Sequence, residues 1–171
     1  AYSELTEYRK MLDGAPEYQV NEFGAPREWQ NDDYPDNPKH RHQSHLYPMF
    51  PGFELARKDE KTDETYRKGG IERMTIGMEY QTSWSLVQNA HLMARVKDSE
   101  LAFESLNRVS KTCIMRNLFT THNDWRSSGL TLEMNSAPFQ IDANIGFVSA
   151  VQEMLLYSDS ERVDLLPALP K

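Results

Sequence analysis

Three stretches of this chain repeat their apolar residues at the 3.6-residue period of an α-helix. They cover residues 60–75, 83–96 and 99–116. The second and third stretches meet at the polar pair Asp98-Ser99, and so short a connection makes neighbouring helices antiparallel. The sequence therefore predicts an αα-hairpin in the middle of the chain.

The first part of the chain predicts a helix followed by irregular structure. Apolar and aromatic residues recur at helical spacing from Tyr2 to Asp13, and Gly14 and Pro16 then end the pattern. Strand-forming residues around a turn over 18–29 predict a short β-hairpin. A polar loop interrupted by prolines follows.

The last part of the chain predicts one more helix and a final extended segment. The helix is expected over 143–157, after an irregular segment over 120–141, with Asp142 as its N-cap. Its predicted apolar stripe consists of Val148, Val151, Met154 and Leu155. Residues 163–166, which precede Pro167, are expected to be extended.

These elements predict a mostly α fold. Helix pairs joined by short turns and separated by long loops are typical of an α/α hairpin array or of part of an α/α toroid, here with a short β-hairpin and a terminal extended segment. In a toroid, the loops at one end build the active site. Because one fold hosts many activities, function must be argued from the side chains.

Charge and composition argue against two classes of partner. The formal net charge is -7 and the basic residues are scattered, so the positive surface expected of a nucleic-acid-binding protein is missing. No apolar run approaches the roughly 20 residues that span a bilayer, so no membrane span is predicted. The single cysteine, Cys113, cannot form an intramolecular disulfide and is expected in the core. The cellular compartment stays open.

The densest polar cluster is the segment His40-Arg41-His42-Gln43-Ser44-His45, which holds three of the five histidines. Imidazole and guanidinium groups can bind sugar hydroxyls or stabilise charge. A metal site with Asp32, Asp33 and Asp36 is a weaker alternative, since the spacing is unusual for zinc and no HExxH pair occurs. A structural hydrogen-bond network is the third interpretation.

Asp142, in the segment 137–146, is the second candidate. A carboxylate at a helix N-terminus is kept ionised by the helix dipole and can act as a base. On position alone, a capping aspartate with Asn144 solvating the first turn is the commoner interpretation. Trp84 could pack on a sugar ring but, on an apolar helix face, is more often core. His91 is expected to be a core histidine bonded to a backbone carbonyl.

Six motifs in collinear order resemble the closing half of the glycoside hydrolase family 95 catalytic domain. They span nearly the whole chain, and six motifs in order with helical spacers between them are specific. They are Glu28-Trp29, the run His40 to Leu46, Pro51-Gly52, Thr82-Ser83-Trp84-Ser85, the segment Phe139 to Gly146, and Leu165-Leu166-Pro167-Ala168-Leu169-Pro170.

The resemblance implies an (α/α)6 barrel that hydrolyses terminal α-L-fucosyl linkages, notably α-1,2, with inversion, although some members prefer α-L-galactose. It implies that Asp142 is the base that activates water, together with asparagines from an earlier part of the domain. It places the general acid upstream of the histidine segment, and Glu28 lies too close to His40 to be that acid. The expected substrate-binding residues are His40, Arg41, His42, His45, Trp84 and Asn144.

The expected domain is thus the C-terminal portion of a catalytic barrel, residues 1–171, with a fucosylated oligosaccharide as substrate and no metal or organic cofactor. A mature domain trimmed at both ends is the alternative for its boundaries. The expected partner is the N-terminal half of the domain, or a second copy of the chain. A catalytically incomplete carbohydrate-binding or structural half-domain is the rival function, and a lyase or phosphorylase would need motifs not found in this sequence. Family analogy suggests a secreted or periplasmic bacterial enzyme.

Overall fold

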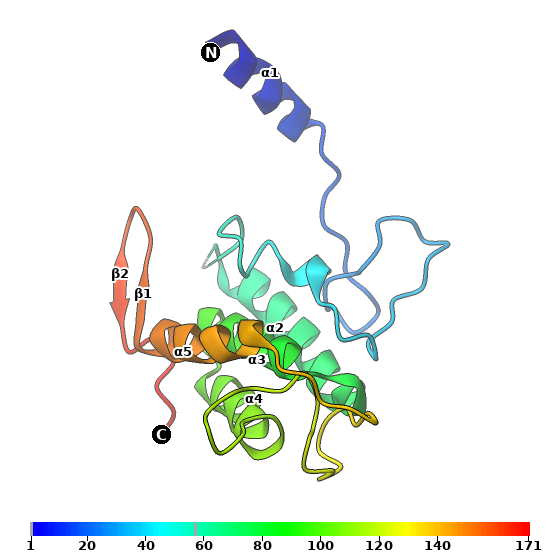
Figure 1. Ribbon diagram of the computed structural model, residues 1–171. Helices are drawn as coiled ribbons and strands as arrows, with labels where there is room; N and C mark the ends of the chain where they lie inside the picture. Colours follow the sequence, from blue (N-terminus) through cyan, green and yellow to red (C-terminus); the bar gives the residue numbers. More distant parts are fainter. Residues whose placement is uncertain (1, 57) are drawn as a thin grey trace.

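The computed structural model describes residues 2–56 and 58–171, and five α-helices make up most of its regular structure (Figure 1). The helices predicted for the first part and the centre of the chain are confirmed, and the first two have the predicted bounds. The helices are α1 (Tyr2–Asp13), α2 (Glu60–Thr75), α3 (Ser83–Arg95), α4 (Ser99–Thr112) and α5 (Ile141–Leu155), with short 3-10 helices η1 (Ser44–Leu46) and η2 (Met78–Tyr80).

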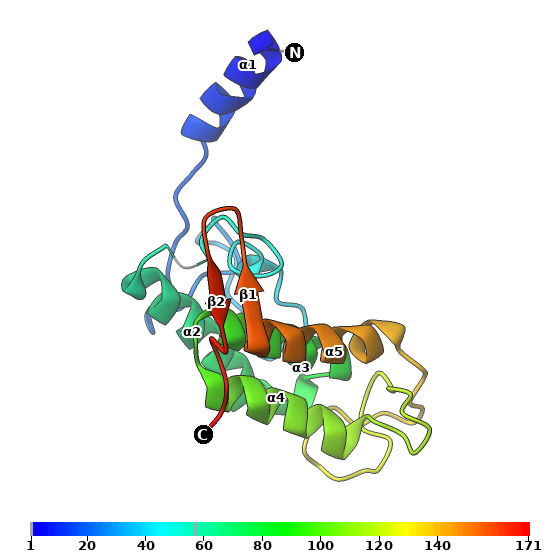
Figure 2. The same ribbon diagram turned by 90° about the vertical axis from the view of Figure 1, so that its left-hand side faces the viewer.

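Helix α1 projects away from the other helices (Figures 1 and 2). Its apolar residues keep more than half of their surface exposed: Leu5 58%, Tyr8 61%, Met11 67% and Leu12 72%. Isolated helices of this length are marginal in water, and an apolar stripe normally forms because it will be buried. The α1 stripe is thus a surface that the rest of this chain does not cover.

Helix α3 is the centre of the packed part of the chain. It contacts α2, α4 and α5 and is buried on nearly all of its surface. A capping box between Thr82 and Ser85 begins it. The predicted αα-hairpin with α4 is confirmed: Asp98 caps α4 by accepting from Leu101 N, and Asn89 of α3 binds the Ser105 hydroxyl of α4.

Helices α3 and α5 run parallel, side by side. Three side-chain contacts join them at almost constant sequence separation: Ser83 to Gln140 at 57, His91 to Ser149 at 58, and Arg95 to Glu153 at 58. Gly146 allows the close approach, because a Cβ there would lie 2.6 Å from Val87 Cγ1. The N-terminal ends of both helices therefore lie at the same end of the bundle.

Two core predictions are confirmed. His91 is buried, its Nδ1 lies 2.8 Å from the carbonyl oxygen of Val87, and its ring stacks on Phe50 at 4.2 Å between centroids. Burial lowers the pKa of His91, which favours the neutral imidazole. Cys113 is fully buried, and burial raises the pKa of its thiol.

The β-hairpin predicted over 18–29 is wrong in extent. Only an isolated antiparallel bridge joins Val20 to Pro26, around a turn in which Asn21 Oδ1 accepts from two backbone N–H groups. Proline has no N–H to donate, and the backbone N–H of Glu28 binds Asp36 instead of a facing strand. The pairing therefore stops after one bridge.

The only regular strands in the described part of the chain are β1 (Leu156–Ser158) and β2 (Val163–Leu165), which form an antiparallel hairpin at its C-terminal end. In their register Leu156 pairs with Leu165 and Ser158 with Val163. The extended segment predicted at 163–166 is confirmed as β2, whereas its partner strand takes up residues 156–157, which were predicted to be helical.

The predicted start of the last helix is also wrong. Helix α5 begins at Ile141 with Gln140 as N-cap, so Asp142 lies in the first turn and is not the cap. Gln140 is held in an extended conformation by Thr120, whose carbonyl accepts from Gln140 N and whose hydroxyl donates to Gln140 O. This pairing to a distant segment fixes where the helix begins.

The apolar stripe predicted for α5 is mostly not buried. Met154 is 5% exposed, but Val148 is 68%, Val151 37% and Leu155 43% exposed. The buried face is formed by the small residues Ala143 and Ala150 together with Met154. The face of α5 that points away from α3 is therefore apolar and uncovered.

Candidate active site

The histidine segment and the start of α3 meet through aromatic rings. His42 lies edge-on to Trp84 with ring centroids 5.0 Å apart, and His40 lies 4.7 Å from His42. His42 is exposed and Trp84 half-buried, so both rings keep open surface. Next to Trp84, the Ser83 hydroxyl donates to Gln140 Oε1 at 2.8 Å, which connects this cluster to the start of α5.

A buried arginine contacts the histidine segment and fixes its position. Arg73 of α2 is 2% exposed and forms an ion pair with Glu28, which is 12% exposed. Its Nη2 binds Glu28, and its Nη1 donates to the backbone carbonyls of Asn37 and His40. Arg73 also lies 3.4 Å from Nε2 of His45. A rigid guanidinium with several donors can thus fix the path of the loop at several points.

The environment keeps two of the histidines neutral. Burial, followed by the nearby charge of Arg73, lowers the pKa of His45 from 6.5 to about 3. Desolvation, followed by the charges of His40 and Arg41, lowers the pKa of His42. A neutral imidazole has one donor and one acceptor, which suits a sugar hydroxyl.

A cavity of about 320 Å³ opens beside this segment. Its described lining residues do not include Asp142. They are Asn37, Lys39, His40, Arg41, Tyr80 and Leu132.

Asp142 and Asn144 lie at the N-terminal end of α5. Asp142 is exposed and lies on the same helical face as Gly146 and Ser149, the residues of α5 that contact α3. Asn144 is half-buried, and its Nδ2 donates to the backbone carbonyl of Leu118 at 3.1 Å. The structure therefore places Asp142 in the same end region as Ser83 and Trp84 without a direct contact to the histidines.

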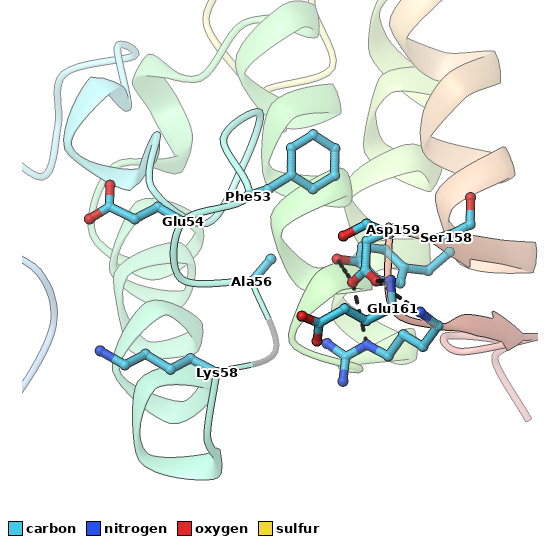
Figure 3. A pocket seen from close by; sticks show the side chains of 10 residues that line it. Phe53, Glu54, Ala56, Lys58, Ser158, Asp159 and Glu161 are labelled. Atoms are coloured by element: carbon cyan, nitrogen blue, oxygen red, sulfur yellow. Dashed lines mark hydrogen bonds and ion pairs between the residues drawn. The ribbon is translucent and has the colours of Figure 1, made fainter. Parts of the chain in front are cut away.

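A larger cavity, of about 680 Å³, lies at the opposite end of α5, between the β1–β2 turn and the residues Phe53, Glu54, Ala56 and Lys58 (Figure 3). None of the predicted site residues lines it within the described chain. Its Asp159 accepts from the backbone N–H groups of Glu161 and Arg162 and from the Tyr157 hydroxyl. These carboxylate contacts stabilise the hairpin turn.

Two further features concern metal-holding clusters and helices long enough to cross a membrane. In the described residues, no group of three His, Cys, Asp or Glu side chains is arranged to hold a metal ion. Among the described helices, none combines the length and apolarity needed to cross a bilayer.

Sequence reasoning missed the residues that support the site. Arg73 lies in a helix of low apolar content, where a buried arginine has the same local pattern as an exposed one. Gln43 is buried and binds Gln81 and the Ser85 carbonyl, whereas the sequence marks it only as a member of the histidine segment. No local signal marks either residue, because their partners lie 28 to 45 positions away.

Comparison with known proteins adds a family to this geometry. Residues 2–155 match the family described as "Glycosyl hydrolase family 95 catalytic domain". "Alpha-L-fucosidase 2" of Arabidopsis thaliana is 32% identical over 91% of this chain. "Probable alpha-fucosidase A" is 27% identical over 86% of the chain in Aspergillus niger and 27% identical over 88% in Aspergillus oryzae.

The chain covers only part of these relatives. It spans 18%, 17% and 22% of their respective lengths. The family match, in contrast, takes in all of α1 to α5, including the histidine segment, Trp84 and Asp142. The chain therefore belongs to the glycosyl hydrolase family 95 catalytic domain family.

Proposed function

We propose that this chain forms the water-activating side of an inverting α-L-fucosidase. In this proposal Asp142 is the base, and His40, Arg41, His42, His45, Trp84 and Asn144 surround the sugar. The substrate is a fucosylated oligosaccharide, or an α-L-galactosylated one. The general acid and the asparagines that orient the water belong to other parts of the catalytic domain.

The parallel packing of α3 and α5 is the observation that carries the proposal. Because Ser83 binds Gln140, the start of α3 and the start of α5 are held together, and each adjoins a proposed site residue, Trp84 or Asp142. The contact of His42 with Trp84 extends the same region to the histidine segment. Loops and helix starts gathered at one end are where toroid enzymes bind substrate.

The chemistry of inversion fits a chain that supplies one carboxylate. An inverting glycosidase needs a protonated acid on the leaving oxygen and a base on a water at the opposite ring face, about 6.5–9.5 Å apart. Asp142 lies in the first turn of α5, near the positive end of the helix dipole. Trp84 offers an aromatic face to the methyl-bearing side of fucose, and neutral His42 offers a hydrogen bond.

The uncovered face of α5 supports a larger domain around this site. Ile141 is 56%, Ile145 65% and Val148 68% exposed, next to Asp142 on the same helix. A contiguous apolar face beside a polar site is typical of a surface that packs against more protein. We infer that the remaining helices of an (α/α)6 barrel, or a second copy, cover this face and enclose Asp142.

The decisive experiment uses the full-length protein and the substitution Asp142→Asn. Turnover of a 2′-fucosylated oligosaccharide is expected to fall by at least ~10²-fold with little change in stability, and NMR should show the inverted anomer as the first product of the parent enzyme. Glu60→Gln is the matched control, because Glu60 is also an exposed carboxylate in a first helical turn. Near-parental turnover in Asp142→Asn would overturn the assignment. A parent protein that binds the sugar but does not hydrolyse it would favour the carbohydrate-binding alternative.

A further inference from the structure

The cavity of about 320 Å³ beside the histidine segment concentrates positive charge in an acidic chain. Three consecutive basic residues, Lys39, His40 and Arg41, line it on one side, with Tyr80 and Leu132 on the other. Its volume is at the lower end of the range of about 300–1,000 Å³ found for ligand sites, which suits one sugar ring. We call it the Lys39 cavity.

The walls of the Lys39 cavity are held in place by groups outside it. Arg73 donates to the carbonyls of Asn37 and His40. Gly77 lies so close to the loop that a Cβ there would come within 2.2 Å of the Pro38 carbonyl oxygen. A site with walls fixed in advance loses less entropy when a ligand binds.

The opposite wall is fixed in the same way. Leu132 N donates to the carbonyl of Gln81 at 3.0 Å, which ties the 120–141 segment to the end of η2. The side chain of Gln81 is buried and donates to the carbonyl of Gly77. Tyr80, which is 41% exposed, is thereby positioned beside the cavity.

Charges around the cavity favour an anion. Lys39 Nζ lies 5.7 Å from the centre of the Tyr80 ring and 4.0 Å from the carboxylate of Glu79, whose side chain is 67% exposed. Arg41 is half-buried, and within the described residues no hydrogen bond or ion pair engages its guanidinium.

The cavity adjoins the proposed sugar-binding cluster. His40 lines the cavity and also lies 4.7 Å from His42, which contacts Trp84. A sugar linked to a fucosyl unit at His42 and Trp84 would reach the Lys39 cavity as its neighbouring residue. Tyr80 can stack on such a ring, while Lys39 and Arg41 can bind an acidic substituent.

We propose that the Lys39 cavity is the leaving-group subsite and selects an anionic sugar, one that carries a carboxylate or a sulfate ester. This rests on the proposed function in one respect only, that the cleaved unit lies at His42 and Trp84. Arg41 suits a planar carboxylate because its guanidinium can bind two oxygens at once.

Kinetics on matched substrates of the full-length protein test the proposal. The substrates share one α-L-fucosyl unit and differ in the sugar that carries it, which is galactose, galacturonic acid or galactose 6-sulfate. We expect kcat/KM to be about 10-fold higher for at least one acidic substrate than for the neutral one, as for one charge-assisted hydrogen bond. Comparison of the two acidic arms identifies carboxylate or sulfate as the recognised group.

The substitution Lys39→Gln should reduce the acidic-over-neutral ratio of kcat/KM by several-fold, and Lys61→Gln, an exposed lysine in the first turn of α2, should keep it. A parent ratio near one, for both acidic sugars, would overturn the subsite. So would a high ratio that Lys39→Gln leaves unchanged, because the preference would then arise elsewhere. If Asp142→Asn still abolishes turnover in either case, the proposed function stands while this inference fails.

Discussion

The hydroxyl of Ser83 donates a 2.8 Å hydrogen bond to Oε1 of Gln140, and this contact joins the first turn of α3 to the N-cap of α5. Thr120 also binds both the backbone N–H and the carbonyl oxygen of Gln140. Asp142 follows Gln140 by two residues. Its position thus depends on Ser83, which lies 57 positions before Gln140 in the sequence. A site assembled in this way responds to changes far from the carboxylate.

The Ser83 contact predicts a positional effect on activity. Ser83→Ala should lower the free energy of unfolding by about 0.5–1.5 kcal/mol, the net value of one such hydrogen bond. In the full-length protein, kcat should fall further than this loss of stability explains, because the start of α5 moves relative to Trp84. Ser110→Ala is the control, since that hydroxyl binds only the carbonyl of Leu106 in its own helix. Equal kcat in both variants would argue against the positional role.

The close approach of α3 and α5 predicts a steric effect at Gly146. Gly146→Ala places a Cβ 2.6 Å from Val87 Cγ1, and Val87 is a β-branched residue that cannot easily turn away. We expect a loss of about 1–3 kcal/mol in unfolding free energy, more than the helix propensity gained by alanine. Chemical denaturation of the parent and variant proteins measures it.

The matched control for this prediction is the same substitution in a Val87→Ala background. Removing the two methyl groups makes room for the new Cβ, so Gly146→Ala should there be neutral or stabilising. The same loss in both backgrounds would show that the approach of the helices does not limit residue 146.

The buried pair of Arg73 and Glu28 predicts strong coupling. Arg73→Met leaves the Glu28 carboxylate buried without its partner and should cost about 3–5 kcal/mol of stability. Removing both charges with Arg73→Met and Glu28→Leu together should cost much less than the sum of the single changes. A double-mutant cycle from urea unfolding measures this coupling, and additive losses would contradict it.

His45 predicts a pH dependence of stability. Its pKa is lowered from 6.5 to about 3, so between these values the unfolded chain binds a proton that the folded chain does not. Stability should therefore be retained above about pH 6.5 and fall as the pH drops toward 3, by up to about 1.4 kcal/mol per pH unit for one proton. His91, whose pKa burial also lowers, acts in the same direction.

The contribution of His45 can be isolated with His45→Gln, which cannot take up this proton. Unfolding free energies measured at pH 4, 5 and 6 should show a slope smaller by about one proton in the variant. Parallel slopes for parent and variant would mean that His45 titrates normally in the folded chain.

The uncovered apolar surfaces predict the behaviour of the 171-residue chain alone. Val148 and Ile145 on α5, and Met11 on α1, are 65–68% exposed. We expect the chain to elute larger than a monomer and to show at most trace activity on an aryl α-L-fucoside, because the acid is expected elsewhere. Ile145→Glu with Val148→Glu should reduce the association. A monomer that turned over the fucoside at about 1–10³ per second would overturn the half-domain proposal.

Local patterns were sufficient for much of the fold. The bounds of α1 and α2, the αα-hairpin of α3 and α4, the extended segment at β2 and the buried state of His91 could all be predicted from residue order. Periodicity, caps and short connections act over a few residues, so they are visible in sequence. The motifs likewise indicated the family, which the comparison confirmed.

The tertiary structure decided what depends on distant partners. Asp142 is not the helix cap, because Thr120 holds Gln140 in that place, and the hairpin forms at 156–165, where Val163 finds a facing strand. Arg73 became the support of the histidine segment through Glu28, 45 positions away. Hydrogen bonds and ion pairs between remote residues leave no periodic trace in the sequence, so the candidate residues could be named from it, whereas their arrangement needed the folded chain.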